Sequence, residues 1–148
     1  MKRVGEFRKL LGVTADVTLK ELKTIYRNEM KATHPDKFAD DAEGLKLAEV
    51  KSQTVIEAYH FLTSIHPETH ESNKEEYTDT ISNYGMSDFY FKKRVLYVQY
   101  ENGMNYEYLG VDESIFVKMI NSDSPSRFAK RHIYGKFIFR KVSNATEA

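Results

Sequence analysis

The sequence predicts two small domains, first an all-α helical hairpin and then a small α+β domain with an antiparallel sheet and two short helices. Apolar residues recur at helical spacing through the first 66 residues, which hold few aromatic side chains. From about residue 84 the character changes, because Tyr and Phe crowd short runs that also contain Val and Ile, a composition typical of strands. This change indicates two modules.

The charge distribution changes in the same region. Residues 71–84 carry one basic and four acidic groups and residues 85–148 carry 10 basic and 7 acidic groups, whereas the whole chain has 22 of each. The polar middle therefore indicates a connection between domains. We expect four segments: a hairpin domain at 1–66, a polar helical linker at 67–85, an α+β domain at 86–142 and a disordered tail at 143–148.

Composition excludes several classes of protein. The 148 residues contain no Cys, which excludes disulfide scaffolds, thiolate zinc sites and cysteine nucleophiles and fits a reducing compartment. No apolar run approaches the roughly 20 residues that span a bilayer, and the N-terminus lacks the apolar core of a secretory signal. We therefore expect a cytoplasmic protein with no membrane partner.

The first domain begins with two predicted helices. A short one covers 6–11. A longer one covers about 19–33, because Thr18 and Glu21 have the spacing of a capping box and Pro35 disfavours helical geometry just before it. The start of the longer helix is thus fixed by local chemistry alone.

A loop at 37–41 separates this helix from a third one, expected at about 42–65 from the spacing of its apolar residues. Pro67 suits the first position of a further helix, and residues 68–83 continue it with mostly polar side chains. We expect the acidic stretch 71–84 to be too polar to contribute to a core.

The second domain has the signals of a sheet. Asn102-Gly103, between two aromatic and β-branched runs, is the strongest short signal for a hairpin, and it favours a type I′ turn with two positive φ angles. The expected strands are 89–91, 95–100, 106–109 and 134–142, and the expected helices are 113–120 and 126–132, with Asp112 and Ser124 as N-caps.

The tripeptide His34-Pro35-Asp36 stands at the end of a basic helix. Pro fixes the backbone, His can donate or accept a hydrogen bond, and Asp offers a carboxylate to an arginine. Basic side chains recur every three or four residues along one face of that helix: Lys20, Lys23, Arg27 and Lys31. The tripeptide alone is a weak signal, but its setting is specific, with Phe7-x-x-Leu10-Leu11-Gly12-Val13 before it and Glu57-Ala58-Tyr59-x-x-Leu62 after it.

Together these motifs resemble the J-domain family of DnaJ-like co-chaperones over residues 5–66. The resemblance implies an antiparallel hairpin of the two long helices, with the tripeptide in the loop at its tip. It also implies that this loop docks on a DnaK-type 70-kDa heat-shock chaperone and stimulates its ATP hydrolysis, so that the chain is not itself an enzyme. The residues assigned by the resemblance are the trigger His34, Pro35 and Asp36 and the docking face Lys23, Tyr26 and Arg27.

Four positions depart from the usual pattern of that family, and one of them is Asn28, which replaces a frequent basic residue. Glu29 replaces an apolar residue, Thr33 replaces the aromatic residue that commonly precedes the His, and Ser52 replaces an aromatic residue of the last long helix. Glu29 also brings a negative charge beside the docking face. These departures bear on docking strength and on the stability of the hairpin, whereas the trigger is intact.

A second set of motifs lies in the C-terminal half. Tyr106-Glu107-Tyr108-Leu109-Gly110-Val111, Ser124-Pro125-Ser126-Arg127-Phe128 and Arg131-His132-Ile133 occur in an order that resembles the KTSC domain over about 90–142. That small module is found at the C-terminus of some lysyl-tRNA synthetases and in stand-alone bacterial proteins. Its function is unsettled, and RNA binding is one suggestion for it.

Residues 124–142 hold six basic residues and no acidic one, with aromatic residues between them. Positive groups beside aromatic rings are what a single-stranded nucleic acid requires. The candidate residues for binding RNA or a protein client are Arg127, Lys130, Arg131 and Lys136. Two alternatives stay open: the aromatic side chains fill the core of a small sheet under a solvated charged face, or the basic surface holds an acidic client.

No motif calls for a cofactor, and no catalytic constellation stands out. His66 and His70 are four residues apart, but Pro67 lies between them and no third metal ligand is evident, so we predict no metal site. The sequence favours a co-chaperone whose C-terminal domain selects a target or client. The alternatives are a nucleic-acid-binding protein whose helical hairpin is only a spacer, and a scaffold with neither activity.

Overall fold

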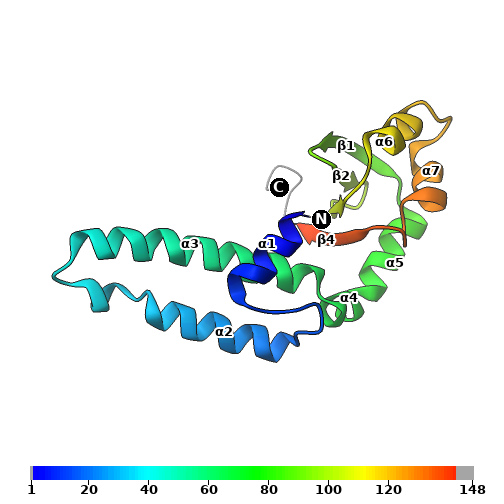
Figure 1. The fold of residues 1–148 in the computed structure, drawn as a ribbon. Coiled ribbons are helices and arrows are strands. Elements are labelled where there is room, and N and C mark those ends of the chain that lie inside the picture. The colour runs from blue at the N-terminus through cyan, green and yellow to red at the C-terminus, as the bar shows by residue number, and fades with distance from the viewer. Residues whose placement is uncertain (1, 143–148) are drawn as a thin grey trace. The chain divides into compact units, whose positions relative to one another are not determined.

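The computed structural model describes residues 2–142, and the chain divides into two compact units, residues 1–69 and 70–148 (Figure 1). The first unit contains α1 (Lys2–Leu11), α2 (Leu19–Ala32), the 3-10 helix η1 (Pro35–Phe38) and α3 (Ala42–Ile65), and α4 (Pro67–Ser72) crosses the boundary. The second unit contains α5 (Lys74–Asn83), β1 (Met86–Lys92), β2 (Val95–Tyr100), β3 (Asn105–Leu109), α6 (Glu113–Ile120), α7 (Pro125–His132) and β4 (Ile138–Val142). A helical part followed by a sheet with two short helices confirms the predicted fold class.

The start of α2 is set by the predicted capping box. Thr18 Oγ1 accepts from Glu21 N, and Glu21 Oε1 accepts from Thr18 N, both at 3.1 Å. These bonds satisfy N–H groups that have no partner inside the first turn. At the other end, Thr33 Oγ1 donates to Glu29 O at 2.9 Å, and the helix stops at Ala32, one residue before the predicted end.

The core of the first unit is built on α3, which runs antiparallel to α2 (Figure 1). Its buried apolar side chains are Ala48, Val55, Ala58, Phe61, Leu62 and Ile65. Leu22 of α2 is fully buried, and Phe7 of α1 meets the ring of Phe61 edge-on at 5.1 Å between centroids. Both other helices therefore pack on α3, and the hairpin is a single folded element.

His66, directly after α3, closes the base of the hairpin. Its Nε2 lies 2.6 Å from Val17 O, so Nε2 carries the proton and donates it. Its Nδ1 accepts from Glu68 N at 3.0 Å, and Glu68 Oε2 accepts from Leu19 N at 3.2 Å. Both ring nitrogens of His66 thus hold the start of α2 against the start of α4.

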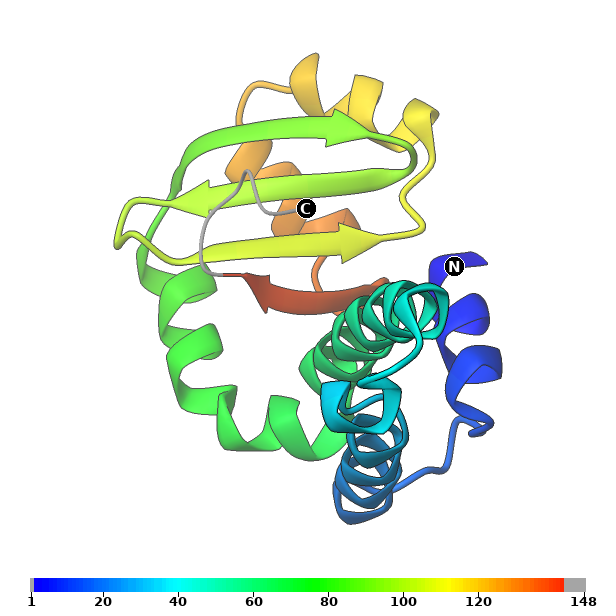
Figure 2. The same cartoon turned by 90° about the vertical axis from the view of Figure 1, so that its left-hand side faces the viewer.

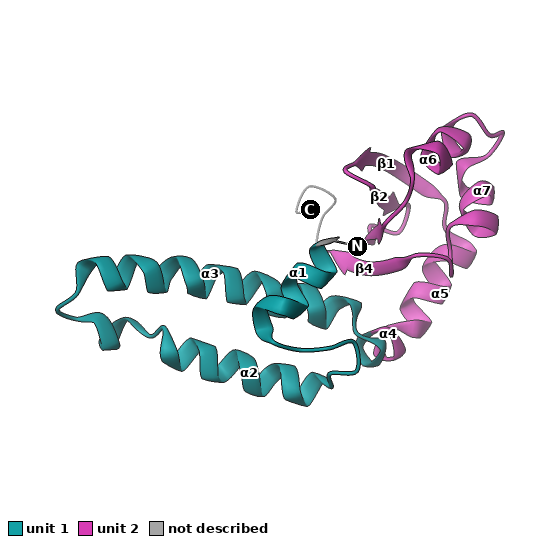
Figure 3. Cartoon of the chain, viewed as in Figure 1, with its two compact units in different colours: residues 1–69 teal, residues 70–148 magenta. Residues whose placement is uncertain are grey.

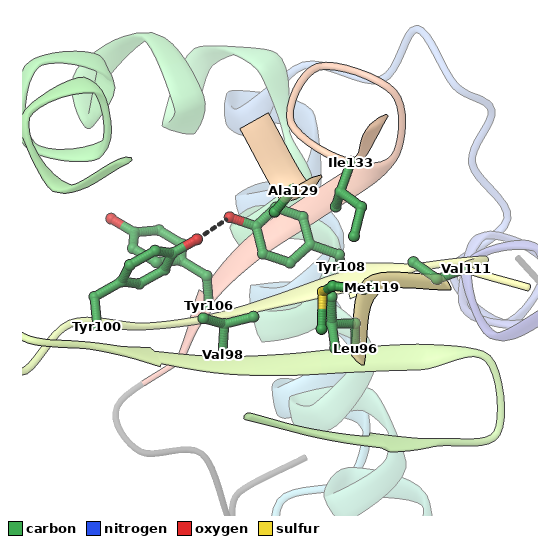
Figure 4. Packing of buried hydrophobic residues seen from close by; sticks show 9 residues of the cluster. All are labelled: Leu96, Val98, Tyr100, Tyr106, Tyr108, Val111, Met119, Ala129 and Ile133. Carbon is green, nitrogen blue, oxygen red and sulfur yellow. Dashed lines mark hydrogen bonds between the residues drawn. The ribbon is translucent and has the colours of Figure 1, made fainter. Parts of the chain in front are cut away.

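The second unit is an antiparallel sheet in the order β1-β2-β3-β4, with α6 and α7 following β3 in the chain (Figure 2). The register pairs Leu96 with Tyr108 and Tyr108 with Phe139, so these side chains share one face of the sheet. The helices cover the same face, and Met119 and Ile133 are fully buried against it (Figure 4). This arrangement confirms that most of the aromatic residues of the second unit build a core.

The acidic stretch before the sheet also contributes to this core, contrary to the sequence expectation. Tyr77 and Ile81 of α5 pack against the buried cluster, and the ring of Tyr77 stacks on Phe139 at 4.2 Å. Thr80 is fully buried and accepts from Asn102 Nδ2 at 2.9 Å. One helical stripe is enough for this packing, and the other faces of α5 hold the charges. α5 therefore belongs to the second unit (Figure 3).

The hairpin turns differ from the prediction. Asn102-Gly103 does mark a hairpin, but only Gly103 of this pair has a positive φ, +85°, and the loop spans the three residues 101–103. A left-handed Gly at the end of a three-residue loop is a common alternative to the type I′ turn. Two consecutive positive φ angles occur instead at Lys93 (50°) and Arg94 (65°), in the two-residue loop between β1 and β2.

The last strand is shorter than predicted. β4 begins at Ile138, because Tyr134 N still donates to Ala129 O behind α7 and Gly135 then turns the chain with φ +79°. The predicted disordered tail at 143–148 lies outside the described residues. Among helices of residues 2–142, none combines the length and the apolar character needed to cross a membrane.

Candidate functional site

The His34-Pro35-Asp36 tripeptide opens η1 in the connection between α2 and α3 (Figure 1). His34 is the N-cap and Pro35 is the first residue, where a missing N–H is tolerated because first-turn N–H groups have no helical partner. The side chains of His34 and Asp36 are 58% and 92% exposed. The loop therefore presents both polar side chains to solvent at the tip of the hairpin.

One hydrogen bond fixes the proton on His34. Its Nδ1 accepts from Asp36 N at 3.2 Å, so the neutral ring carries its proton on Nε2. The carboxylate of Asp36 lies 3.5 Å from the same Nδ1, but an ion pair there requires a proton on Nδ1 and hence loss of the bond from Asp36 N. In this geometry the loop offers a partner an N–H donor from His34 and a carboxylate from Asp36.

The basic face of α2 is exposed at Lys23 and Arg27, about one turn apart. Within residues 2–142 neither side chain takes part in an ion pair, so both charges are available to a partner. Tyr26 is placed differently, because its ring stacks on Tyr59 of α3 at 4.2 Å and the side chain is half-buried. Its assignment to the docking face stays a prediction.

Three of the departures from the family pattern have local partners in the structure. Thr33 is buried and bonds to the end of α2, and Ser52 Oγ donates to Glu49 O within α3 at 3.0 Å. Glu29 forms an ion pair with Lys51 of α3. Sequence reasoning missed Lys51, because only the antiparallel packing of α2 on α3 brings it to Glu29.

The basic stretch of the second unit divides into two groups. Arg140 Nη1 donates to Glu107 Oε1 on the neighbouring strand, and Lys141 Nζ donates to Glu76 Oε1 on α5, both at 2.7 Å. These two charges therefore have acidic partners from other parts of the chain. Residues 124–142 contain no acidic residue, but this does not mean that all their basic side chains are unpaired, because acidic partners come from elsewhere in the chain.

Arg127 and Arg131 belong to the other group and line a cavity of about 360 Å³, whereas Lys130 and Lys136 do not line it. The remaining lining comes from the end of α6, the following loop and α7: Asn121, Ser122, Asp123, Ser124, Phe128 and His132. Of the four candidate residues in the sequence, the structure thus brings two together at one concave site. The exposed residues of the α6–α7 loop carried no signal for a cavity in the sequence.

Four tyrosine hydroxyls form a chain of hydrogen bonds inside the second unit. The hydroxyl oxygen of Tyr108 lies 2.7 Å from that of Tyr100 (Figure 4) and 3.1 Å from that of Tyr77. The hydroxyl of Tyr100 donates to that of Tyr134 at 2.8 Å. Burial is the main cause that raises the pKa of each, to about 12 for Tyr134 and well above the usual range for Tyr108. The hydroxyls stay protonated near neutral pH, so this chain is part of the core.

Comparison with known proteins matches both halves of the chain. The family model of the DnaJ domain matches residues 6–68, and that of the KTSC domain matches residues 86–137. Both resemblances drawn from the sequence are thereby confirmed, and the two matches leave residues 69–85 between them.

Similar curated proteins carry DnaJ names. "Chaperone protein DnaJ" of Mesomycoplasma hyopneumoniae is 42% identical over 59 residues, which are 39% of this chain and 16% of that protein. Its namesake in Hydrogenobacter thermophilus is 34% identical over 74 residues, covering 50% and 18%. "DnaJ protein homolog XDJ1" of Saccharomyces cerevisiae is 36% identical over 61 residues, covering 41% and 13%. The chain thus spans less than a fifth of the length of these relatives.

Proposed function

We propose that this chain, which joins a DnaJ domain at residues 6–68 to a KTSC domain at residues 86–137, is a co-chaperone of a DnaK-type 70-kDa heat-shock chaperone. The loop His34-Pro35-Asp36 docks on that ATPase and stimulates its ATP hydrolysis. The chemistry then takes place in the partner, and the chain itself acts as a regulator. The cytoplasmic location expected from the sequence stays a prediction.

The observation that carries the proposal is the geometry of the tip of the hairpin. A capped helix with a free basic face ends in a proline-fixed loop whose His and Asp side chains are exposed. Such side chains add little to the stability of the fold, because they are largely exposed to solvent. Their arrangement is that of a recognition surface, in which charge guides the approach and the loop supplies specific hydrogen bonds.

The second unit is proposed to select what the chaperone acts on. The supporting observation is the cavity beside α7, with two arginines that have no ion-pair partner within residues 2–142. A nucleic-acid-binding protein with the hairpin as a mere spacer is the alternative. The exposed trigger loop favours the co-chaperone, because a spacer has no use for an exposed His and Asp held in a defined turn.

The decisive experiment is single-turnover ATP hydrolysis by the 70-kDa chaperone of the same organism, with and without the full chain. We expect wild type to accelerate hydrolysis and His34→Gln to abolish the acceleration while thermal unfolding of the chain is unchanged. Lys37→Gln, also exposed in η1, is the matched control and should retain most of the activity. Equal rates with wild type and His34→Gln would show that the co-chaperone proposal is wrong.

The docking face is tested separately with Arg27→Ala. We expect weaker binding and a smaller dependence of the remaining affinity on salt, because attraction between exposed charges is screened over about 8–10 Å at physiological ionic strength. Lys9→Ala, an exposed basic residue on α1, is the control and should leave affinity and salt dependence unchanged.

A further inference from the structure

The cavity beside α7 holds two cationic side chains on one helix face. Arg127 and Arg131 are one turn apart, and both line the space of about 360 Å³ between the α6–α7 loop and α7. Arg94 and Arg140 each pair with a carboxylate, whereas neither cavity arginine does so within residues 2–142. Two guanidinium groups that form no ion pair within residues 2–142 and lie in one concavity fit an anionic ligand, and their planar forks match the oxygens of a phosphate group.

The same cavity has an aromatic wall. Phe128 and His132 line it with ring centroids 4.6 Å apart and planes tilted by 43°. Phe128 is held by its packing against the core of the second unit, so its ring is fixed in place. Flat aromatic groups of this kind accept a nucleobase by stacking. The concavity therefore offers both chemistries that a nucleotide needs.

We propose that this cavity binds a nucleotide, with the phosphate between Arg127 and Arg131 and the base against Phe128 and His132. Asp123 lines the same cavity, and its carboxylate can accept from a ribose hydroxyl or an exocyclic amino group. A free nucleotide and a nucleotide within single-stranded RNA offer this same chemistry. The inference deepens the proposed role of the second unit and does not depend on the trigger loop.

The test is fluorescence anisotropy of a labelled single-stranded RNA pool with the full chain at low salt, competed with adenosine monophosphate. Arg127→Gln and Arg131→Gln should each weaken binding by about tenfold, the usual effect of losing a charge-assisted hydrogen bond to phosphate. Each should also reduce the slope of log K against log salt by about 0.7. Lys130→Gln removes one charge from the same helix outside the cavity, and we expect a change of less than about twofold.

Each outcome decides the matter. If the mononucleotide displaces the RNA, the ligand of the cavity is a free nucleotide. If it does not, the ligand is a nucleotide within RNA. Either result supports the cavity as the binding site, provided that binding also depends on Arg127 and Arg131. Equal losses for Lys130→Gln and the arginine variants would assign binding to the general charge of α7 and overturn the proposal. So would absence of binding, or equal competition by an acidic peptide, which would instead favour a protein client.

Two further measurements keep this result separate from the co-chaperone activity. Arg127→Lys keeps the charge but loses the fork, so we expect an intermediate loss of RNA affinity with unchanged thermal unfolding. The arginine variants should also stimulate the DnaK-type ATPase as wild type does. Loss of RNA binding with normal stimulation isolates the cavity, whereas normal RNA binding without stimulation isolates a failure of the trigger loop.

Discussion

Lys51 Nζ on α3 lies 3.4 Å from Glu29 Oε2 on α2, so the acidic residue beside the docking face is paired with a base from the other helix of the hairpin. The two side chains are 56% and 35% exposed, and an exposed pair of this kind contributes roughly 0.2–1 kcal/mol to stability. Its larger consequence is electrostatic. Lys51 offsets a negative charge that would otherwise oppose the attraction of Arg27 to an acidic partner.

Lys51→Ala should therefore weaken docking on a DnaK-type chaperone by a few-fold at low salt, because Glu29 loses its counter-charge. The double variant Lys51→Ala/Glu29→Gln should restore the affinity almost to that of wild type. Affinities measured by calorimetry at two salt concentrations give the coupling between the two residues. A double variant as weak as Lys51→Ala alone would mean that Lys51 acts on the partner directly.

Two tyrosines on β3 should differ sharply although both are 1% exposed. Tyr108 has hydrogen bonds to Tyr77 and Tyr100, whereas the buried hydroxyl of Tyr106 has no partner within residues 2–142. We expect Tyr108→Phe to lower the free energy of unfolding by about 1–3 kcal/mol, because it leaves partner hydroxyls unsatisfied. Tyr106→Phe should cost less than about 0.5 kcal/mol, since it removes only a group that is costly to bury. Urea titrations measure both free energies of unfolding, and an equal decrease for the two variants would contradict the different roles of the two hydroxyls.

The second unit should lose stability in alkaline solution. Burial raises the pKa of Tyr134 to about 12, and burial followed by the nearby Glu76 raises that of Tyr106 to about 12, whereas unfolded tyrosines ionise near pH 10. The folded state thus retains protons that the unfolded state releases. The contribution of these tyrosines to the free energy of unfolding should be constant below about pH 10 and fall between about pH 10 and 12. Urea titrations across this range measure it, and an unchanged midpoint at pH 11.5 would refute the expectation.

The second unit should need α5 to fold. A fragment of residues 70–148 retains the contacts of Tyr77, whereas a fragment of residues 86–148 lacks them. We expect the shorter fragment to be less stable by at least about 3 kcal/mol, the usual cost of removing a large buried aromatic side chain. Tyr77→Ala in the full chain should show a similar loss, and Tyr84→Ala, at a 39% exposed position, is the matched control. Equal melting temperatures for the two fragments would show that α5 does not stabilise the second unit and acts only as a linker.

The β1–β2 turn can be relieved of strain. Lys93 has φ 50°, a left-handed conformation that costs most side chains about 1–2 kcal/mol and that Asn adopts more readily. Lys93→Asn should raise the free energy of unfolding by up to about 1 kcal/mol. Lys92→Asn, at a paired β1 position, should give no gain. A gain for both variants would point to the change of charge and not to the backbone.

The sequence predicted the features that are local in the chain. The capping box of Thr18 and Glu21 and the helix of residues 113–120 are formed as expected, because their determinants lie within a few residues of one another. The turn at Lys93 was not predicted, since its residues disfavour positive φ and the paired strands impose it. Features of this second kind depend on contacts between residues that are distant in the chain.

The candidate sites follow the same division. The trigger loop was readable as a tripeptide after a basic helix. The cavity was not, because Arg127 and Lys130 have equivalent charges in the sequence and only the packing of the α6–α7 loop distinguishes them. In the sequence Arg140 is one more basic residue in a stretch without acidic ones. The structure pairs it with the carboxylate of Glu107 on the neighbouring strand, so its charge is not free.

The uneven distribution of tyrosine also makes the two units distinguishable by spectroscopy. The chain has no Trp, and eight of its 10 tyrosines lie in residues 70–148. Near-ultraviolet absorbance and intrinsic fluorescence will therefore report chiefly on the second unit and on its buried hydroxyl chain. Circular dichroism at 222 nm will draw its larger share from the first unit, because α1, α2 and α3 hold more than half of the α-helical residues within residues 2–142. The unfolding of each half can thus be followed in the intact protein without an added label, and a difference between the two signals measures directly whether the halves unfold together.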